Sequence, residues 1–289
     1  MSRTLRVGLT QWHPTTDVET NLAIALDLVG KAGTAGADLV VLPENGLMLG
    51  TNVEMRARAL KQDGPEIAAL ATVAAEHAVT VVVGGMKNAT PEGVFNSAVV
   101  IGPDGKVAGR YDKIHLFNAR VNGQSFEASS VEQAGTTPVL LDLEQAVVGL
   151  TICYDVRFPE LSRALALAGA EVLLVPSAFV HTTGRAHWHT LLAARAIENG
   201  CFVVAPATIR GGPDAGDAFQ TFGHALVVSP WGEILADLGE DAAAVQVLEL
   251  DLGEVARVRS MLPVLEGTMP AAYATAPERI RVTSNEESR

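Results

Sequence analysis

Cysteine is scarce in this sequence, which has only Cys153 and Cys201 among 289 residues. Two cysteines are too few for a disulfide framework, and this excludes the class of small secreted domains that disulfides hold together. The count suits a reducing compartment, and we expect a cytoplasmic protein. Cys201 stands in an apolar run directly after Gly200, so we expect it to be packed inside a strand.

Basic residues are also few, because 21 Lys and Arg stand against 33 Asp and Glu, for a net charge of −12. Nucleic-acid binding through a broad face needs clustered Lys and Arg, which this balance does not favour. No apolar stretch approaches the roughly 20 residues of a membrane span, and the N-terminus lacks the apolar core of a signal peptide. We therefore expect no nucleic-acid partner and no membrane association.

Apolar residues are abundant, at 48% of the chain, and stand mostly in short segments. A chain of this length can bury a large core, and we expect one domain over residues 1–275 with a polar tail over 276–289 that frays or docks on a partner. Turns expected at 103–106 and 229–232 form hairpins, which indicates mixed sheets rather than a plain doubly wound sheet. Strands are expected at 5–10, 38–42, 80–84, 97–101, 147–152, 172–176, 202–205, 225–228 and 244–250, and helices at 17–35, 67–77, 159–168 and 186–199.

The most informative segment, residues 147–160, is an apolar run that ends abruptly at Cys153 and leads into a helix start. A cysteine on a strand-to-helix turn is exposed at a sheet edge, near N–H groups that favour its thiolate. Asp155, Arg157 and Glu160 are expected to hold this turn through ion pairs and capping. A cysteine alone is more often a packed small hydrophobe, so the assignment depends on other segments.

Two other segments supply charged partners for this cysteine. An apolar strand at 39–42 delivers Glu44 directly after a proline, and the segment 110–117 contains Lys113. Taken singly, either charge is typical of a solvated surface residue. Together with Cys153 they can converge at one edge of a sheet core. A base, a cation and a nucleophile are the groups that acyl transfer through a thioester requires.

These three segments resemble the three signature blocks of the carbon–nitrogen hydrolase (nitrilase) superfamily, with its Glu-Lys-Cys triad. Further blocks at 8–12, 96–98, 183–188, 195–199 and 223–233 are similar and occur in the family's order, so the resemblance covers about residues 5–270. It implies an α-β-β-α sandwich, in which two mixed sheets pack face to face between helices. It also implies a homodimer or higher homo-oligomer, with the helices at 159–168 and 186–199 in the interface.

The resemblance also assigns roles to the triad. It implies that Cys153 is the nucleophile, that Glu44 is the general base and later acid, and that Lys113 stabilises the oxyanion together with the backbone N–H of Tyr154. We expect the following helix to lower the pKa of Cys153 and partial burial to raise the pKa of Glu44. The implied reaction passes through a thioester acyl-enzyme after loss of ammonia, and it needs no metal and no organic cofactor.

The superfamily usually carries a second glutamate after the lysine block, in a Phe/Tyr-x-Glu-Ser pattern several residues before a glycine. Phe126 and Gly135 keep this spacing, but Ala128 then occupies the position of the glutamate. Glu127, one residue earlier, is our candidate for orienting the catalytic lysine, and Glu132 is the alternative.

The residues after Cys153 bear on the substrate. They read Tyr-Asp, where true nitrilases have Trp-Glu, and this resembles the amidase branch with deaminated-glutathione amidase and omega-amidase. The branch implies a small linear amide that bears a carboxylate, of the deaminated-glutathione or α-keto-acid type. Arg185 and Arg210 are candidates to pair with that carboxylate. Two alternatives stay open: an N-carbamoyl amine or amino-acid amidohydrolase with the same triad, and a non-catalytic binding or assembly module.

The histidines give no sign of a metal site in the sequence. His187 and His189 stand two apart on an expected helix, so they do not share a face. His115, His181 and His224 are scattered and have no cysteine pairs beside them, so the usual ligand spacings predict no zinc site.

Overall fold

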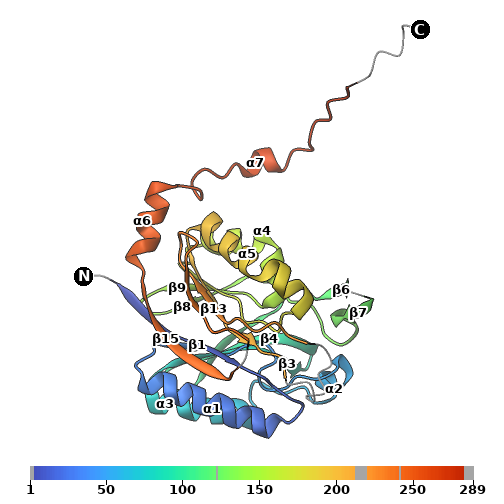
Figure 1. Cartoon of the computed structure of the whole chain (residues 1–289), viewed down its shortest axis with the longest axis vertical. Coiled ribbons are helices and arrows are strands. Elements are labelled where there is room, and N and C mark those ends of the chain that lie inside the picture. The colour runs from blue at the N-terminus through green and yellow to red at the C-terminus, as the bar shows by residue number, and fades with distance from the viewer. Residues whose placement is uncertain (1–2, 122, 212–219, 241, 283–289) are drawn as a thin grey trace.

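The computed structural model describes residues 3–121, 123–211, 220–240 and 242–282. Two β-sheets pack face to face, and helices cover the outer face of each sheet (Figure 1). This arrangement confirms the α-β-β-α sandwich that the sequence predicts. None of the described helices is both long enough and apolar enough to cross a membrane.

The first half of the chain contains β1 (Thr4–Trp12), α1 (Val18–Thr34), β2 (Leu39–Val41), α2 (Asn52–Ala57), α3 (Pro65–His77), β3 (Thr80–Thr90), β4 (Gly93–Ile101), β5 (Val107–Asp112), β6 (Asn118–Val121), β7 (Gln124–Glu127) and β8 (Val139–Asp142). The second half contains β9 (Val147–Leu150), α4 (Pro159–Leu167), β10 (Val172–Leu174), α5 (His181–Asn199), β11 (Phe202–Ala205), β12 (Ala207–Thr208), β13 (Leu226–Val228), β14 (Ile234–Asp237), β15 (Ala244–Asp251), α6 (Gly253–Met261) and α7 (Pro270–Tyr273).

Both sheets are mixed. The first has the strand order β12-β1-β2-β3-β4-β5, with β15 antiparallel to β1. In it, β1, β2 and β3 are parallel, and β4 and β5 follow as antiparallel hairpin strands. The second sheet has the order β14-β13-β11-β10-β9-β8, with β9, β10 and β11 parallel at its centre. Both expected hairpins are present, between β4 and β5 and between β13 and β14.

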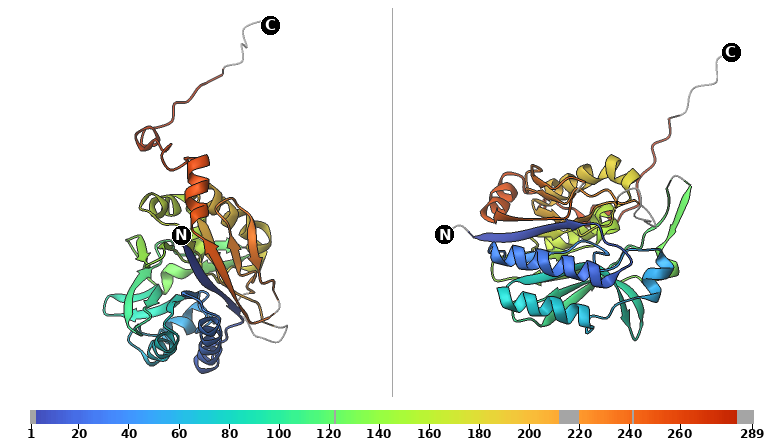
Figure 2. Two further views of the ribbon diagram at one scale, coloured as in Figure 1. Left: turned by 90° about the vertical axis from the view of Figure 1, so that its left-hand side faces the viewer. Right: turned by 60° about the horizontal axis from the view of Figure 1, so that its bottom comes forward.

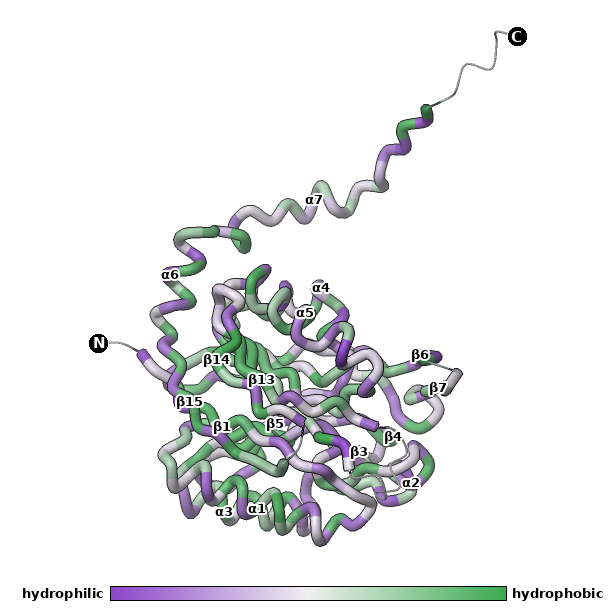
Figure 3. The backbone as a smooth tube through the Cα atoms, viewed as in Figure 1, coloured by the Kyte–Doolittle hydropathy of each residue, from purple (hydrophilic) through white to green (hydrophobic). Residues whose placement is uncertain are grey.

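The central strands are apolar on both sides because each sheet is covered on both faces. In β2, Leu39 and Val41 face the core between the two sheets, whereas Val40 belongs to the separate core under α1 and α3. In Figure 3 the strands in the middle of the sandwich have the colour of hydrophobic residues along much of their length. Helices α1 and α3 cover the first sheet, and α4 and α5 cover the second (Figure 2).

Helix α5 begins five residues earlier than expected, at His181 rather than Ala186. Its first turn is polar, so apolar periodicity did not reveal it. The Gly184 N–H donates to the Val180 carbonyl oxygen at 2.8 Å and starts the helical bonding there. Because Gly184 packs against the Phe222 ring with no room for a Cβ, this early turn is held against the segment that precedes β13.

Candidate active site

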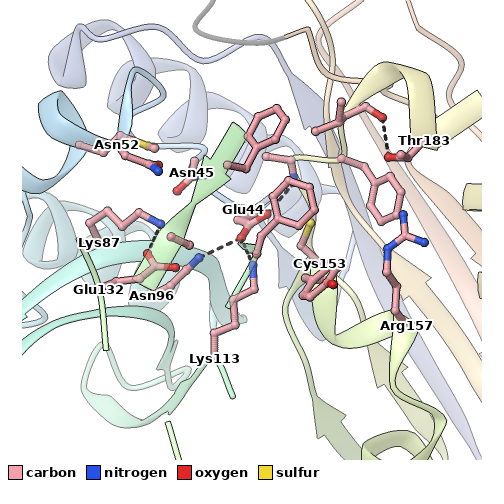
Figure 4. A pocket seen from close by; sticks show the side chains of 18 residues that line it. Glu44, Asn45, Asn52, Lys87, Asn96, Lys113, Glu132, Cys153, Arg157 and Thr183 are labelled. Atoms are coloured by element: carbon pink, nitrogen blue, oxygen red, sulfur yellow. Dashed lines mark hydrogen bonds and ion pairs between the residues drawn. The ribbon is translucent and has the colours of Figure 1, made fainter. Parts of the chain in front are cut away.

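Glu44, Lys113 and Cys153 come from both sheets and meet in one pocket (Figure 4). Glu44 follows β2, Lys113 follows β5, and Cys153 follows β9. The three residues are only 3–8% exposed. The structure therefore brings together the three side chains that the sequence singled out, at the place where strand ends of the two sheets face each other.

The Glu44 carboxylate is held by three hydrogen-bond donors. Its Oε1 accepts from Lys113 Nζ at 2.7 Å and from Asn96 Nδ2 at 2.9 Å. Its Oε2 accepts from the Ala178 N–H at 2.9 Å. Since Asn96 lies in β4 of the first sheet and Ala178 follows β10 of the second, the carboxylate is fixed from both sides.

The backbone of β3 passes so close to Glu44 that position 85 requires a glycine. Gly85 has φ +118°, and a Cβ there would lie 2.9 Å from Asn96 Oδ1 and 3.2 Å from Glu44 Cγ. The Gly85 carbonyl oxygen also accepts from the Asn45 N–H at 2.6 Å. Strand β3 can therefore pass close to the carboxylate only without a side chain at this position.

Cys153 occupies a sharp strand-to-helix turn with φ +47°, a left-handed conformation that is strained for a residue other than glycine. A short 3₁₀-helix, Cys153–Arg157, begins at this residue. Asp155 is fully buried, and its Oδ2 accepts from the Tyr111 hydroxyl at 2.8 Å and from the Ile152 N–H at 2.9 Å. Asp155 therefore ties the turn to β5, which is the structural role expected for it.

The pKa shifts at Glu44 and Cys153 run opposite to both expectations. Burial alone would raise the pKa of Glu44, but the Lys113 and Lys87 ammonium groups outweigh it and lower this pKa to about 2. Burial, together with the Glu44 carboxylate, raises the pKa of the Cys153 thiol against the opposing effect of Lys113. The resting site thus holds a carboxylate and a neutral thiol.

Lys113 remains an ammonium ion. Burial alone would lower its pKa, but the negative charges of Glu44 and, after it, Glu132 raise it well above the usual value for lysine. A permanent cation beside the thiol is suited to stabilising an oxyanion that forms on an attacked carbonyl group.

The structure does not place Glu127 in the pocket. Glu127 is exposed at the end of β7, where its carboxylate accepts a hydrogen bond from the Ser125 hydroxyl at 3.2 Å. Glu132, the alternative, is 6% exposed, lines the pocket and forms an ion pair with Lys87. The preferred candidate is therefore corrected from Glu127 to Glu132.

Local backbone structure explains this correction. A 3₁₀-turn, Ala128–Ser130, follows β7. A bridge between Gln133 and Phe95 then holds the chain beside β4. The intervening Glu132 consequently lies next to Asn96, whereas Glu127 precedes the turn and stays outside.

Lys87 is a site residue that the sequence analysis missed. It lies in β3 and is 9% exposed, although lysine is seldom buried. Its signal in the sequence is a lysine that continues an apolar strand with no break. With Lys87 the pocket contains two carboxylates, Glu44 and Glu132, and two ammonium groups, so its buried charges balance.

The arginines are placed differently from the expectation. Arg185 is exposed on α5, and Arg210 lies 3.7 Å from Glu240; neither lines the pocket. Arg157 does line it, with its guanidinium carbon 5.9 Å from the centre of the Tyr154 ring and 5.0 Å from that of Phe179. Arg157 was expected only to hold the turn, and its position gives the pocket a further cation.

Comparisons with known proteins agree with this geometry. The carbon–nitrogen hydrolase family model matches residues 6–260. A deaminated glutathione amidase of Synechocystis sp. is 40% identical over 255 residues, which span 85% of this chain and 91% of that protein. The omega-amidase NIT2 of Homo sapiens is 33% identical over 270 residues, or 93% of this chain and 96% of that one. The crystal structure of the C. elegans NitFhit protein is similar with a TM-score of 0.86 at 33% identity, covering 94% of this chain and 67% of that chain.

Substitution of Glu132 tests whether its carboxylate is buried beside Lys87. We expect Glu132→Gln to lower the free energy of unfolding by roughly 3–5 kcal/mol, because it leaves the Lys87 charge buried without its partner. The matched change Glu127→Gln is expected to stay within about 0.5 kcal/mol of the parent because Glu127 is exposed. Urea unfolding of the variants measures both values.

A double variant, Lys87→Met with Glu132→Leu, tests whether the stability lost in Glu132→Gln comes from the unpaired Lys87 charge. It is expected to recover most of the lost stability because both buried charges are removed together. Equal stability of the parent and Glu132→Gln would contradict a buried Lys87–Glu132 pair.

Proposed function

This chain belongs to the carbon–nitrogen hydrolase family, and we propose that it hydrolyses the C–N bond of a small amide that carries a carboxylate. The observation that carries the proposal is the Glu44 carboxylate, fixed by Lys113, Asn96 and the Ala178 N–H in the same pocket as the Cys153 thiol. The names of the deaminated glutathione amidase and omega-amidase relatives favour a deaminated-glutathione-like or α-keto-acid amide.

In the first half of the proposed reaction, Cys153 Sγ bonds to the amide carbonyl carbon and the thiol proton passes to Glu44. The C=O bond becomes a C–O⁻ group, which the Lys113 ammonium and the Tyr154 backbone N–H stabilise. Glu44 then gives its proton to the nitrogen as the C–N bond breaks. A primary amide thereby releases ammonia and leaves a thioester on Cys153.

In the second half, water attacks the thioester carbonyl carbon and Glu44 takes a proton from that water. The C–S bond breaks, the proton returns to sulfur, and the carboxylic acid leaves. Because the pKa of Glu44 is low and that of Cys153 is raised, the first proton transfer accompanies C–S bond formation rather than preceding it. The fixed positive charge of Lys113 stabilises the oxyanion that forms together with this transfer.

We propose Arg157 as the group that binds the substrate carboxylate. Lys113 is paired with Glu44 and Lys87 with Glu132, whereas none of the carboxylates in the described ranges forms an ion pair with Arg157. Its guanidinium carbon lies over the Phe179 ring and its Nη1 is 3.3 Å from His187 Nδ1, so the remaining N–H donors are the ones available for a two-point contact with a carboxylate. This assignment replaces Arg185 and Arg210.

The proposal is tested first by turnover of a panel of amides. The panel contains an α-keto-acid primary amide, deaminated glutathione, a neutral amide, an N-carbamoyl amino acid and a nitrile, and the assay measures ammonia, amine and acid products. We expect turnover of a carboxylate-bearing amide that Cys153→Ala abolishes. Cys201→Ala is the matched control, because Cys201 is fully buried with its Sγ 3.2 Å from the Ala170 carbonyl oxygen, so this change costs stability rather than activity.

Other results in this panel select the alternatives. Carbon dioxide released together with ammonia identifies an N-carbamoyl hydrolase that uses the same triad. No turnover of any compound, together with a Cys153 thiol that electrophiles do not label in folded protein, favours a non-catalytic binding or assembly module. Equal loss of activity in Cys153→Ala and Cys201→Ala, with both folded, contradicts the division of roles between the two cysteines.

Replacement of Arg157 tests the carboxylate contact. Arg157→Met keeps much of the packing against aromatic rings but removes the charge, so we expect KM for the carboxylate-bearing amide to rise about 10–100-fold. KM for a neutral amide of equal length should change little, and Arg185→Met should change neither value. An equal rise in KM for the charged and the neutral amide would mean that Arg157 stabilises the turn after Cys153 instead of binding the carboxylate.

We propose that the chain acts as a homodimer through the face formed by α4, α5 and the β13–β14 turn. Large apolar side chains are exposed there: Leu167 on α4 at 52%, Ile197 on α5 at 51% and Trp231 in the turn at 45%. Ile197 also packs against Gly232, so α5 and the turn form one surface. The segment after α6 leaves the body of the molecule (Figure 1) and exposes Tyr273 at 72%, which suits a chain end that docks on a partner.

Light scattering after size-exclusion chromatography tests the dimer. We expect a mass of twice 30.3 kDa at micromolar protein, reduced to 30.3 kDa by Ile197→Glu. Val53→Glu is the matched control, because Val53 is an exposed apolar residue on α2, away from this face. A parent protein that elutes as a monomer would contradict the proposed interface.

We also propose a cytoplasmic location and a single catalytic domain that extends to about residue 275. Both cysteines are free and buried, as suits a protein of a reducing compartment. The end of the family model at residue 260 and the lack of a helix or strand in the described residues 276–282 support a boundary near residue 275.

A further inference from the structure

A second group of titratable side chains lies on the outer side of the second sheet, between α5 and the β13–β14 hairpin. His189 comes from α5, His224 lies two residues before the start of β13, and Asp237 ends β14. None of these residues lines the catalytic pocket. Their side chains are 20–36% exposed, so the group is partly enclosed but open to solvent.

Both imidazole rings direct one nitrogen at the same carboxylate. His189 Nε2 lies 3.0 Å from Asp237 Oδ2, and His224 Nδ1 lies 2.9 Å from Asp237 Oδ1. One ligand atom from each of the three residues lies within 4.8 Å of the others. Tetrahedral Zn²⁺ with bonds of about 2.0–2.2 Å holds its ligand atoms about 3.3–3.6 Å apart, which is within the range of these distances.

The other nitrogen of His224 also has a partner. His224 Nε2 lies 3.3 Å from Glu240 Oε1, and Glu240 is further surrounded by His181 at 4.0 Å and Arg210 at 3.7 Å. Metal-ligating histidines commonly donate their second N–H to a carboxylate, which fixes the tautomer and the ring orientation. With Glu240 in that role, His224 Nδ1 is the nitrogen left to bind a metal.

His224 is held in place independently of these polar contacts. Its backbone has φ +56°, and its carbonyl oxygen accepts from Trp188 Nε1 at 2.9 Å. Its ring stacks on Phe222 with a centroid distance of 4.5 Å. A rigid ligand loses little conformational entropy when it binds an ion, so the group is preorganised on at least one side.

Asp237 presents both carboxylate oxygens to the two imidazole rings, and its Oδ1 also accepts from the Gly239 N–H at 2.9 Å. A carboxylate with two imidazole nitrogens is a donor set that suits Zn²⁺ and related divalent transition metals.

We propose that His189, His224 and Asp237 form a binding site for a divalent transition metal, with Zn²⁺ as its preferred ion and a fourth position open to water. The ion fastens α5 to the β13–β14 hairpin, two elements that also form the proposed dimer face. The site is separate from the Cys153 pocket, and the proposal is independent of the proposed hydrolysis.

Zinc binding by the full-length, tag-free chain tests this site. Isothermal titration at pH 7.5 in a non-chelating buffer uses a Cys153→Ala parent, so that the active-site thiol cannot bind the metal. We expect one equivalent of Zn²⁺ to bind with a micromolar or lower Kd and to raise the Tm of this parent. In the same background, Asp237→Asn and His189→Ala should each weaken binding at least 10-fold and abolish the Tm rise, and Glu240→Gln should weaken it about 10-fold.

His187→Ala is the matched control, since His187 lies on the same helix but contacts Arg157 instead, and it should bind Zn²⁺ like the parent. Asp237→Asn keeps the size of the side chain, and the Tm of each variant without metal reports whether it folds. The proposal is overturned if the parent binds no Zn²⁺, or if binding persists undiminished in folded Asp237→Asn. Either result would mean that Asp237 links the two imidazole rings and does not bind a metal.

Discussion

The buried contact between Glu44 and Lys113 is the interaction on which the rest of the site depends. Removing two charges from water costs several kcal/mol for each ion, and their mutual attraction offsets this only when the remaining polar atoms are also satisfied. Here Asn96 and the Ala178 N–H supply that compensation. The donors come from different sheets, so the sandwich must assemble before the carboxylate is stable in its place.

This requirement explains why the site lies at strand ends rather than in the middle of the sandwich. Along the centres of β2, β10 and β11 every residue is apolar and buried, and an ionised group there would meet no donors. At the strand ends the backbone leaves the sheets and offers unpaired N–H and C=O groups. Glu44 and Cys153 both follow such ends, and each bonds through side chain or backbone to the segment 176–178 of the second sheet.

The sequence predicts that Glu44 and Cys153 meet because each follows a short apolar strand. Lys113 follows β5, which contains Arg110 and Asp112, so its place in the site was expected from its combination with the other two residues rather than from an apolar strand. The sequence predicts Lys87 and Glu132 poorly, since their pairing joins β3 to a turn 45 residues later, a contact that no local pattern encodes. Glu127 is the glutamate next to position 128 in the sequence, but it precedes the 3₁₀-turn and is exposed, whereas Glu132 follows the turn and lines the pocket. The expected pKa shifts at Glu44 and Cys153 failed for a related reason. The degree of burial and the second lysine, Lys87, are properties of the assembled sheets.

The histidine group shows the same limit in a different chemistry. Spacing rules for metal ligands compare residues on one segment. By those rules His187 and His189 cannot bind one ion together, because they lie two residues apart on a helix and point to different faces. The relevant neighbours of His189 are His224 and Asp237, which a hairpin brings to α5 from 35 and more residues away. The backbone conformation of His224 and its stacking on Phe222 depend on that hairpin. Both groups of polar residues therefore follow from one property of the fold: parallel strands and their returning hairpins bring distant chain segments to a shared edge, where their polar side chains can contact one another.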